Sequence, residues 1–485
     1  MINSRKDIQY FLLEVEKKFP VNKWKVNGIH IWPHIRIKLY FYLINLIEKN
    51  DSSPIKTKPE KKGKERIKSD LKKLLAVFHF YKWLYTLPKK KNLFVGADAH
   101  RVDYRHTRFN RYFDILIEKY NLSQNSMYFE YGVNTNKQYN SSLIFTFSKA
   151  LSGFLFLNKI LKIKGNVQLE GYEVFLDYLK KDELFSQFST FYSKKNVSNW
   201  ASLVCYPRVV FFKKVLTKIK PEKAVILCYY LDDIMALTAA ANQLKIQTIE
   251  MQHGPQTSVH MAYSSWFTLP PEGYDMLPRN YWCWDENSKN LLQEWTKSNK
   301  NYAVKVIGNP WIDYWKSMKK NYVHTNYILY SLQPSPLTME QLFPESIINF
   351  IKENPIPWFI RLHPRQLNEM DAIKIYLKNK QILHLVTIDA ATNDPLPLIL
   401  SNALLHITHF SGTAIEASLF NVFTVLLNEI GKLSFQDLIS AQKAVYLDVN
   451  SLEFSEDLRK SIKNKAQFSK DVSAQNDLKL LNLFD

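Results

Sequence analysis

The sequence predicts an α/β protein built from two Rossmann-like domains that face a cleft, with additional helices at its N-terminus. The chain has 485 residues, which is too long for one ordinary hydrophobic core and a natural length for two domains. From about residue 91 onward, short apolar runs alternate with helical patterns, as in βαβ units that build parallel sheets. Polar and charged residues follow directly after several predicted strands, where such sheets bind ligands.

The composition is that of a globular and strongly basic protein. Apolar residues make up 46% and charged residues 23% of the chain. The formal net charge of +20 favours polyanions, phosphorylated substrates or an anionic membrane surface as partners, although a lysine-rich composition without any special partner explains it equally well. The three cysteines (Cys205, Cys228 and Cys283) form no CxxC pair, which indicates a reducing cytosol and predicts neither a disulfide framework nor a zinc site.

Residues 1–90 are predicted to form a helical and basic N-terminal segment. The first 19 residues have the pattern of an amphipathic helix rather than of a signal peptide. Residues 54–73 carry nine Lys or Arg against three acids, which is typical of a solvated linker that either contacts anionic lipid headgroups or is simply soluble. Stretches 74–87 and 142–161 come nearest to a membrane span, but lysines interrupt them, and we interpret them as buried helices, with contact to a membrane surface as the alternative. We therefore expect a cytoplasmic protein, with a peripheral position at the inner face of the membrane as the alternative.

Residues 91–310 are predicted to form the first Rossmann-like domain. Asp232 or Asp233 is placed to cap the helix that follows its clearest strand. The predicted elements are strand 92–97, helix 106–120, strand 223–230, helix 231–244, strand 246–254 and strand 302–310.

Residues 311–450 are predicted to form the second Rossmann-like domain, and residues 451–485 a helical tail. The two domains are expected to join near 310–325. The predicted elements are strand 326–334, helix 338–354, and strands 357–364, 383–389, 403–410 and 422–429.

The stretch "HFSGTAIEA" is the most informative local feature of the second domain. A strand ends near Thr408 and a helix begins near Thr413, so Ser411, Gly412 and Thr413 place hydroxyl and backbone N–H groups at a helix N-terminus, which is suited to a phosphate. Glu416 lies one turn further, where a carboxylate can accept hydrogen bonds from ribose hydroxyls. The alternative is structural: Ser411 and Thr413 cap the helix, and Glu416 completes a capping box with Thr413.

The stretch "FIRLHPRQ" ends an earlier strand of the same predicted sheet. Arginine binds phosphate bidentately and histidine donates a hydrogen bond to it, so Arg361 and His363 are candidate phosphate ligands. Pro364 stops the strand and stiffens the turn. The side chain of Arg365 is as consistent with exposure to solvent as with contact to a ligand. Because both stretches follow strands of one sheet, together they predict an anion site.

The end of strand 246–254 carries the candidate groups of the first domain. His253 is a candidate general base or hydroxyl-binding group, with Gln252 before it and His260 seven residues later. The alternatives are that His253 is a turn residue in the domain interface, and that Asp232 or Asp233 supplies the base.

Several motifs are absent from the sequence. It contains no D-x-D, no GxxxxGK[ST], no GxGxxG after a strand, no HExxH and no GxSxG. An NTPase, a dehydrogenase, a zinc protease and a common hydrolase therefore lose support, and no metal ion or cofactor is expected. A binding protein for nucleic acid or membrane remains a competing hypothesis because of the charge, although no nucleic-acid motif supports it.

At these residues the chain resembles bacterial GT-B glycosyltransferases of surface-polysaccharide biosynthesis, such as those of capsule and O-antigen clusters. The matching pieces are "QHG", "GYDMLPRNYWCW", "VIGNP", "RLHP" and "HFSGTAIEA", which span about 250–420. A His-Pro motif followed by a Ser/Thr motif also resembles bacterial sialyltransferases and Kdo transferases, which use CMP-sugars. Their acidic motif ending in glycine is not cleanly matched, since Asp233 is followed by Ile234 and the Glu272–Gly273 pair is preceded by Pro271.

The resemblance implies a metal-independent glycosyltransferase that uses a CMP-, UDP- or GDP-sugar and a surface-polysaccharide or lipid-linked glycan acceptor, without nucleic acid. It also implies that residues 91–310 bind the acceptor and that residues 311–450 bind the nucleotide-sugar. The alternative is another GT-B-fold enzyme, such as a nucleotide-sugar epimerase or a polyol-phosphate transferase. The implied base is His253, Asp232 or Asp233. The implied donor ligands are Arg361, His363, Pro364, Ser411, Gly412, Thr413 and Glu416. The implied acceptor ligands are Gln252, His260 and Glu272.

Overall fold

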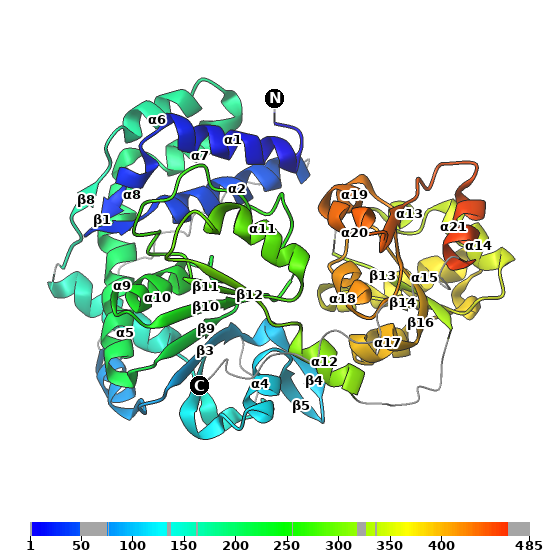
Figure 1. Ribbon diagram of the computed structural model, residues 1–485, viewed down its shortest axis with the longest axis horizontal. Helices are drawn as coiled ribbons and strands as arrows, with labels where there is room; N and C mark the ends of the chain where they lie inside the picture. The colour runs from blue at the N-terminus through cyan, green and yellow to red at the C-terminus, as the bar shows by residue number, and fades with distance from the viewer. Residues whose placement is uncertain are drawn as a thin grey trace, which may run out of the picture. The chain divides into compact units, whose positions relative to one another are not determined.

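The computed structural model describes residues 2–48, 75, 77–132, 137–161, 163–254, 256–317, 326–334 and 337–463. The basic stretch 54–73, the junction residues 318–325 and the tail beyond residue 463 lie outside this part of the chain. Two compact units are present (Figure 1): unit 1 comprises Met1–Arg101 and Arg105–Val306, and unit 2 comprises Val102–Tyr104 and Ile307–Asp485. The division falls a few residues before the expected boundary at 310.

Unit 1 contains a seven-stranded parallel sheet in the order β12-β11-β10-β9-β3-β6-β7. The first strand of the sheet, β3, lies inside it; the chain moves outward to β6 and β7 and then returns to the other side of β3 with β9. This is the strand order of a Rossmann fold, and it places the topological switch point between β3 and β9. The strands are β3 (Asn92–Ala97), β6 (Ser126–Tyr131), β7 (Ile144–Phe145), β9 (Lys223–Ile226), β10 (Gln247–Met251), β11 (Asn280–Cys283) and β12 (Ala303–Val306).

Helices surround the sheet of unit 1, and a large hydrophobic core joins most of them to it. The polar stretch Thr107–Asn110, which we expected to open a helix, is instead strand β5, paired with β4 (Arg101–Tyr104). The helices are α1 (Arg5–Lys18), α2 (Trp32–Glu48), a helix over 77–86, α4 (Phe113–Lys119), α5 (Ser148–Leu161), α6 (Tyr172–Leu179), α7 (Ser186–Phe191), α8 (Lys194–Trp200), α9 (Tyr206–Ile219), α10 (Asp232–Gln243) and α11 (Glu286–Thr296).

The N-terminal helices are integral to unit 1. Ser4 and Asp7 form a capping box that starts α1. Between α1 and α2, strands β1 (Lys25–Val26) and β2 (Ile29–His30) form a small antiparallel sheet with β8 (Val167–Gln168). Arg36 of α2 is fully buried, and its Nε donates to Glu16 of α1 over 2.6 Å. The two helices are therefore joined by a buried ion pair as well as by apolar contacts.

Unit 2 contains a six-stranded parallel sheet in the order β15-β14-β13-β16-β17-β18. This is again the Rossmann order, with the switch point between β13 and β16. Strand "YILYS" (β13) is buried along its whole length, as expected for a parallel strand covered on both faces. The strands are β13 (Tyr327–Ser331), β14 (Trp358–Arg361), β15 (Val386–Thr387), β16 (Ala403–Thr408), β17 (Thr424–Leu426) and β18 (Ala444–Tyr446).

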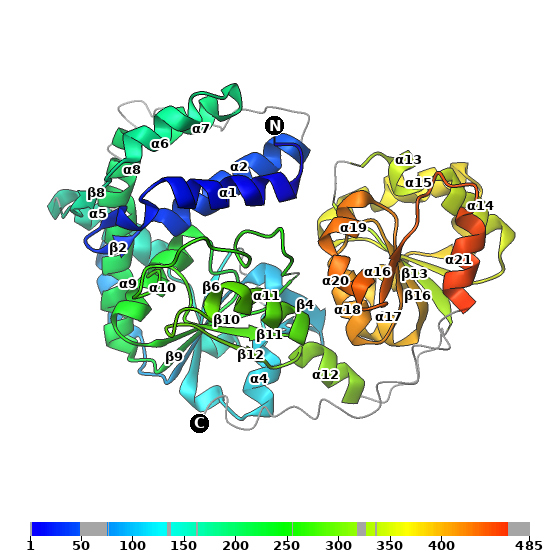
Figure 2. The ribbon, with the colours of Figure 1, turned by 45° about the horizontal axis from the view of Figure 1, so that its top comes forward.

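Two separate cores line the two faces of this sheet. One contains side chains of α14, α15 and α21, and the other those of α16, α17 and α18. Figure 2 shows α14 and α21 on one side of the sheet and α17 and α18 on the other. The helices are α12 (Pro310–Ser317), α13 (Met339–Leu342), α14 (Glu345–Glu353), α15 (Met370–Asn379), α16 (Asp389–Asn393), α17 (Leu396–Asn402), α18 (Thr413–Leu419), α19 (Glu429–Ser434), α20 (Gln436–Ser440) and α21 (Phe454–Lys463).

The structure confirms the predicted fold class of two Rossmann-like α/β domains with additional N-terminal helices. That the domains face each other across a cleft stays a prediction. The prediction that Asp232 or Asp233 caps α10 was wrong: the cap is Leu231, and no side chain accepts a hydrogen bond there. Both carboxylates are instead held by cations from other helices. Within the described residues, no helix is long and apolar enough to cross a membrane.

Candidate functional site

The switch point of unit 2 gathers polar groups from two neighbouring strands. The hydroxyl of Thr408, at the end of β16, donates to the carbonyl oxygen of Ser331 over 2.8 Å and lies 3.2 Å from Oε1 of Gln333, which follows β13. Gln333 is only 5% exposed, and its Nε2 has no hydrogen-bond partner among the described residues. A buried amide donor without an acceptor destabilises the folded protein. Because Gln333 lies at the edge of the sheet where ligands bind, its Nε2 is a candidate donor to a ligand.

The loop between β16 and α18 adds two hydroxyl groups to this edge. The Ser411 hydroxyl accepts from the N–H of Thr413 over 3.3 Å, and the two hydroxyl oxygens lie 3.1 Å apart. The capping-box alternative was wrong, because the residue at the cap position of α18 is Gly412, which has no side chain to accept a hydrogen bond. Glu416 is largely buried inside α18. The helix has only seven residues, so the hydroxyls of Ser411 and Thr413, rather than the helix N-terminus, are the candidate ligands.

His409 begins the same loop and is fixed from two sides. Its Nε2 lies 2.8 Å from the Tyr330 hydroxyl and 3.2 Å from the carbonyl oxygen of Leu342. Burial lowers the pKa of His409 to about 4, so the ring is neutral at pH 7. A Cβ atom at Gly431 would collide with the carbonyl oxygen of His409, so only glycine fits against this loop.

The "RLHP" stretch ends β14 at the same edge, on the other side of β13. Nη1 of Arg361 donates to the carbonyl oxygens of Ala391 and Asp394, so that nitrogen holds the end of α16. The role of Arg361 in binding phosphate stays a prediction.

His363 starts the 3₁₀ turn Pro364–Glu369, and its Nδ1 accepts from the N–H of Arg365 over 3.1 Å. When the ring is neutral, its proton therefore sits on Nε2, which can donate a hydrogen bond. Pro364 takes the first position of the turn, after the end of β14. Because proline has no N–H, it could not continue the hydrogen bonds of the strand.

Gln333 is the residue of this edge that the sequence analysis did not single out. It follows β13 by two positions, and β13 lies between the strands that end in "RLHP" and in "HFSGT". The sequence did contain a signal for Gln333, because it lies near the end of strand 326–334, which was expected in the same sheet as "RLHP" and "HFSGT". A single glutamine after a strand is not distinctive until the strand order makes it central.

In unit 1, His253 follows β10 and lies against a buried carboxyl group. Its Nδ1 is 3.4 Å from the carbonyl oxygen of Met251 and 3.6 Å from Oε1 of Glu250, and its ring lies 5.4 Å from that of His100. Burial lowers the pKa of His253 to about 4. Glu250 accepts hydrogen bonds from the N–H of Tyr229 and the Tyr263 hydroxyl. Burial raises the pKa of Glu250 well above its usual value. Neither Glu250 nor His100 was predicted, although an acid inside an apolar strand was a visible signal.

Asp232 and Asp233 line a pocket of about 260 Å³ near the switch point of unit 1. Asp232 pairs with Lys38 at 2.7 Å and lies 3.7 Å from Nδ1 of His34, and Asp233 pairs with Arg208 at 2.7 Å. Burial raises the pKa of Asp232, but His34 and Lys38 outweigh it and the net shift is downward, so this carboxylate is ionised at neutral pH. The pocket is lined by Tyr131, Phe147, Arg208, Leu231, Asp232, Asp233 and Ile234.

The predicted acceptor ligands do not gather at one point. Gln252 is fully buried, and its amide is bonded to Ser288 Oγ and to the N–H of Trp284. Glu272 is exposed and pairs at 3.4 Å with both Lys25 and His30 of the β1–β2 hairpin.

His260 lies in an aromatic cluster instead, with ring contacts to Tyr40, Tyr230 and Tyr263. Burial lowers the pKa of His260 to about 4.

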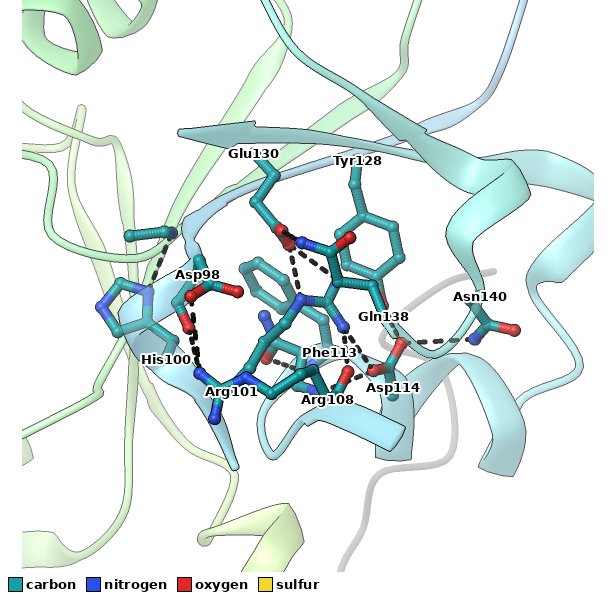
Figure 3. Close-up of polar contacts among 12 residues, drawn as sticks. Asp98, His100, Arg101, Arg108, Phe113, Asp114, Tyr128, Glu130, Gln138 and Asn140 are labelled. Atoms are coloured by element: carbon teal, nitrogen blue, oxygen red, sulfur yellow. Dashed lines mark hydrogen bonds and ion pairs between the residues drawn. The ribbon is translucent and has the colours of Figure 1, made fainter. Parts of the chain in front are cut away.

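A buried ionic network follows β3 in unit 1 (Figure 3). The guanidinium of Arg101 donates to Glu130 over 2.7 Å and to Asp114 over 3.3 Å, and the Tyr128 hydroxyl also donates to Asp114. Burial raises the pKa of Asp114 to about 6 despite these bonds. Arg101 also donates to the carbonyl oxygen of Arg108 in β5, so we interpret the network as the anchor of the β4–β5 hairpin. Across the described residues, no group of three or more His, Cys, Asp or Glu side chains is placed to hold a metal ion.

Comparison with known proteins finds similarity only among solved structures, since no family model and no curated protein matches the chain. The UDP-GlcNAc 2-epimerase of Methanocaldococcus jannaschii is similar with 16% identity and a TM-score of 0.42, over 77% of this chain and 92% of that one. The enzyme of the same name from Neisseria meningitidis has 17% identity and a TM-score of 0.43, over 79% and 95%. The glycotransferase of kitacinnamycin has 11% identity and a TM-score of 0.40, over 78% and 91%.

Proposed function

We propose that this chain is an enzyme that acts on a nucleotide-sugar, and that unit 2 binds the nucleotide-sugar at the carboxyl ends of β13 and β16. The observation that carries the proposal is Gln333, whose buried Nε2 has no partner among the described residues. The hydroxyls of Ser411 and Thr413 are presented at the same edge of the sheet. A phosphate group offers the acceptor oxygens that these donors require.

His363 supplies a further donor to this site. With Nδ1 occupied by the N–H of Arg365, its Nε2 carries the proton in the neutral ring. A hydrogen bond to a leaving phosphate strengthens as negative charge develops on it, which lowers the barrier to cleavage of the sugar–phosphate bond. Glu416, buried in the helix after the loop, is assigned to ribose hydroxyls.

The reaction that we favour is metal-independent transfer of the sugar to a hydroxyl of a glycan acceptor, of the surface-polysaccharide or lipid-linked kind. A base must then remove the proton of the acceptor hydroxyl. Asp232 and Asp233 are the better candidates, since they line a pocket. Basicity does not separate the candidates, because the pKa of Asp232 is lowered and that of His253 is about 4, so both groups are ready to accept a proton at pH 7 but are weak bases.

Epimerisation of the nucleotide-sugar is the second candidate, and it shares the proposed binding site. Six of the similar structures carry the name UDP-GlcNAc 2-epimerase, abbreviated or in full, and one carries the name glycotransferase. The two reactions differ in their products: transfer releases a free nucleotide and needs an acceptor, whereas epimerisation changes the sugar and leaves the nucleotide attached. Product analysis with and without acceptor glycan separates them.

The binding proposal is tested by thermal shift with CMP, UDP, GDP and their sugars. Binding to the native state raises the melting temperature, so one nucleotide family should do so strongly. Gln333→Leu, which keeps the size of the side chain and removes its donor, should weaken that response by about tenfold in apparent Kd. Gln442→Leu is the matched control, since Gln442 is an exposed glutamine of unit 2. An unchanged response in Gln333→Leu, or no response to any nucleotide, would overturn the proposal.

A further inference from the structure

Three helices of unit 1 pack together into a surface that the proposed function does not use, apart from Arg208 of α9, which lines the pocket of Asp232 and Asp233. Phe80 of helix 77–86 contacts Phe154 of α5 and Phe211 of α9, with ring centroids 5.2 Å and 5.6 Å apart. Phe154 and Phe211 also contact each other at 5.6 Å. Figure 1 shows α5 and α9 at the left side of unit 1. We call the outer surface of helix 77–86, α5 and α9 the basic helical face.

The basic helical face contains no acidic residue. The sequence has no Asp or Glu between Asp70 and Asp98, between Glu130 and Glu170, or between Glu183 and Glu222, and these intervals contain all three helices. The three helices carry only basic charges, from Lys82, Lys149, Lys159, Arg208, Lys213, Lys214 and Lys218. Arg208 is paired with Asp233, while Lys82, Lys149, Lys159 and Lys214 are exposed. The face is therefore positive as a consequence of its sequence.

An aromatic stripe lies on the same face. Phe78, Tyr81 and Tyr85 of helix 77–86 are 71%, 57% and 83% exposed. Their spacing of three and four residues puts them on one side of the helix, opposite Phe80 and Trp83, which are buried. Side chains of this size are rarely left in water together unless the surface has a partner.

The basic face and its stripe are in contact. Nζ of Lys218 lies 5.5 Å from the centre of the Tyr85 ring. Lys82 lies between Tyr81 and Tyr85 along the helix. At the end of α5, Ile160 and Leu161 are exposed as well. The combination of lysines, aromatic rings and aliphatic side chains is what distinguishes this face.

We propose that the basic helical face docks unit 1 on a bilayer surface that contains anionic lipid. Lysines near such a surface are attracted to its negative potential. Tyr and Phe insert their rings at the level of the headgroups. A nucleic acid would also attract the lysines and stack on the rings, but it offers nothing to Ile160 and Leu161. The proposal is independent of the reaction that the enzyme catalyses.

Co-sedimentation of the full-length chain with lipid vesicles tests the proposal. We expect binding to phosphatidylcholine vesicles that contain phosphatidylglycerol and little binding to pure phosphatidylcholine. Binding should weaken as salt rises from about 0.1 M to about 0.5 M, because salt screens the lysines. The triple variant Phe78→Ser, Tyr81→Ser, Tyr85→Ser and the triple variant Lys82→Gln, Lys149→Gln, Lys218→Gln should each bind at least about tenfold less.

Matched variants separate this face from the general positive charge of the protein. Tyr10 and Phe267 are 57% and 50% exposed elsewhere on unit 1, and Lys245, Lys297 and Lys300 are exposed lysines outside the face. Serine at the two aromatic positions, or glutamine at the three lysines, should leave vesicle binding unchanged. Circular dichroism and melting temperature show that each variant is folded.

Three outcomes would overturn the proposal. They are equal binding to both kinds of vesicle, equal loss of binding in face and control variants, and salt-dependent binding to DNA without binding to vesicles.

Discussion

Oε1 of Glu250 lies 3.6 Å from Nδ1 of His253, and both side chains are enclosed at the end of β10. Glu250 accepts hydrogen bonds from Tyr229 and Tyr263 but is not paired with Lys or Arg in any ion pair of the described residues. A buried carboxyl group without a cation favours its neutral form, and accordingly burial raises its pKa well above the usual value. Glu250 therefore stays protonated to a higher pH in the folded protein than in the unfolded chain.

The first prediction concerns the stability of Glu250→Gln. A folded-state pKa above the unfolded value means that the carboxyl group contributes most stability below its unfolded pKa of about 4.5 and loses that contribution as pH rises through the folded pKa. Glutamine is neutral throughout, so the variant should gain stability relative to the wild type between pH 5 and pH 9. Melting temperatures of the variant and of the wild type across that range measure the difference in stability. The prediction is contradicted if the melting temperature of the variant does not rise relative to that of the wild type as the pH increases.

The second prediction concerns two glycines. At Gly431 an added Cβ atom would collide with the carbonyl oxygen of His409, whereas at Gly254 nothing lies within 4 Å of such an atom. Gly431→Ala should therefore cost about 1–3 kcal/mol of unfolding free energy, because backbone on both sides must move. Gly254→Ala should change it by less than about 0.5 kcal/mol. Urea denaturation compares the two, and similar midpoints would show that the loop at His409 is not tightly packed.

Much of the fold could be predicted because parallel strands covered on both faces appear as short apolar runs. This holds for Asn92–Ala97 and Tyr327–Ser331, where the pattern and the structure agree. The hydrophobic pattern gave the wrong prediction at Thr107–Asn110, where a helix was expected. This polar stretch forms a strand by pairing with β4. The pattern also failed at residues 383–385, which form a 3₁₀ turn before a strand of two residues. At Thr107–Asn110 tertiary pairing, not local preference, decided the structure.

The candidate site was predictable in part for a similar reason. The rule that ligands bind at the carboxyl ends of strands placed "RLHP" and "HFSGT" at one edge, which the sheet order bears out. The partners of individual side chains were not predictable. Arg361 reaches Ala391 and Asp394, which are thirty or more residues away in the sequence. Asp232 meets Lys38 of α2 rather than the N-terminus of its own helix.

The third prediction concerns acid sensitivity of unit 2. His406 is fully buried between Ser331 Oγ and Thr424 Oγ1, and burial lowers its pKa to about 3. A folded pKa below the unfolded value of about 6.5 means that the stabilising contribution is present above pH 6.5 and is lost as pH falls toward 3. By pH 5 the loss amounts to about 2 kcal/mol.

His406→Gln should therefore be less stable than the wild type at pH 8 but should lose less stability on going to pH 5. Chemical denaturation at the two values measures the change in each protein. His384→Gln is the control, since His384 is exposed in the same unit and should leave the pH dependence as it is. Parallel losses in the wild type and in His406→Gln would show that other groups cause the acid sensitivity.

The fourth prediction tests the proposed donor site through activity. His363→Ala and Glu416→Ala should each lower kcat/KM for the nucleotide-sugar by at least about tenfold, which corresponds to about 1.4 kcal/mol of lost transition-state stabilisation. Arg365→Ala should change it little, since its N–H, which bonds Nδ1 of His363, belongs to the main chain and survives the substitution. Initial rates at a saturating donor concentration give kcat, and initial rates at a limiting donor concentration give kcat/KM.

Whether a substitution changes kcat or KM distinguishes the roles assigned to His363 and Glu416. His363 is assigned to the leaving phosphate, where charge grows during the reaction, so its loss should appear mainly in kcat. Glu416 is assigned to the ribose, which is bound alike before and during the reaction, so its loss should appear mainly in KM. Melting temperatures near the wild-type value show that neither variant is unfolded. Near-normal kcat/KM in both variants would remove the assignment of this edge as the donor site, whatever reaction the enzyme catalyses.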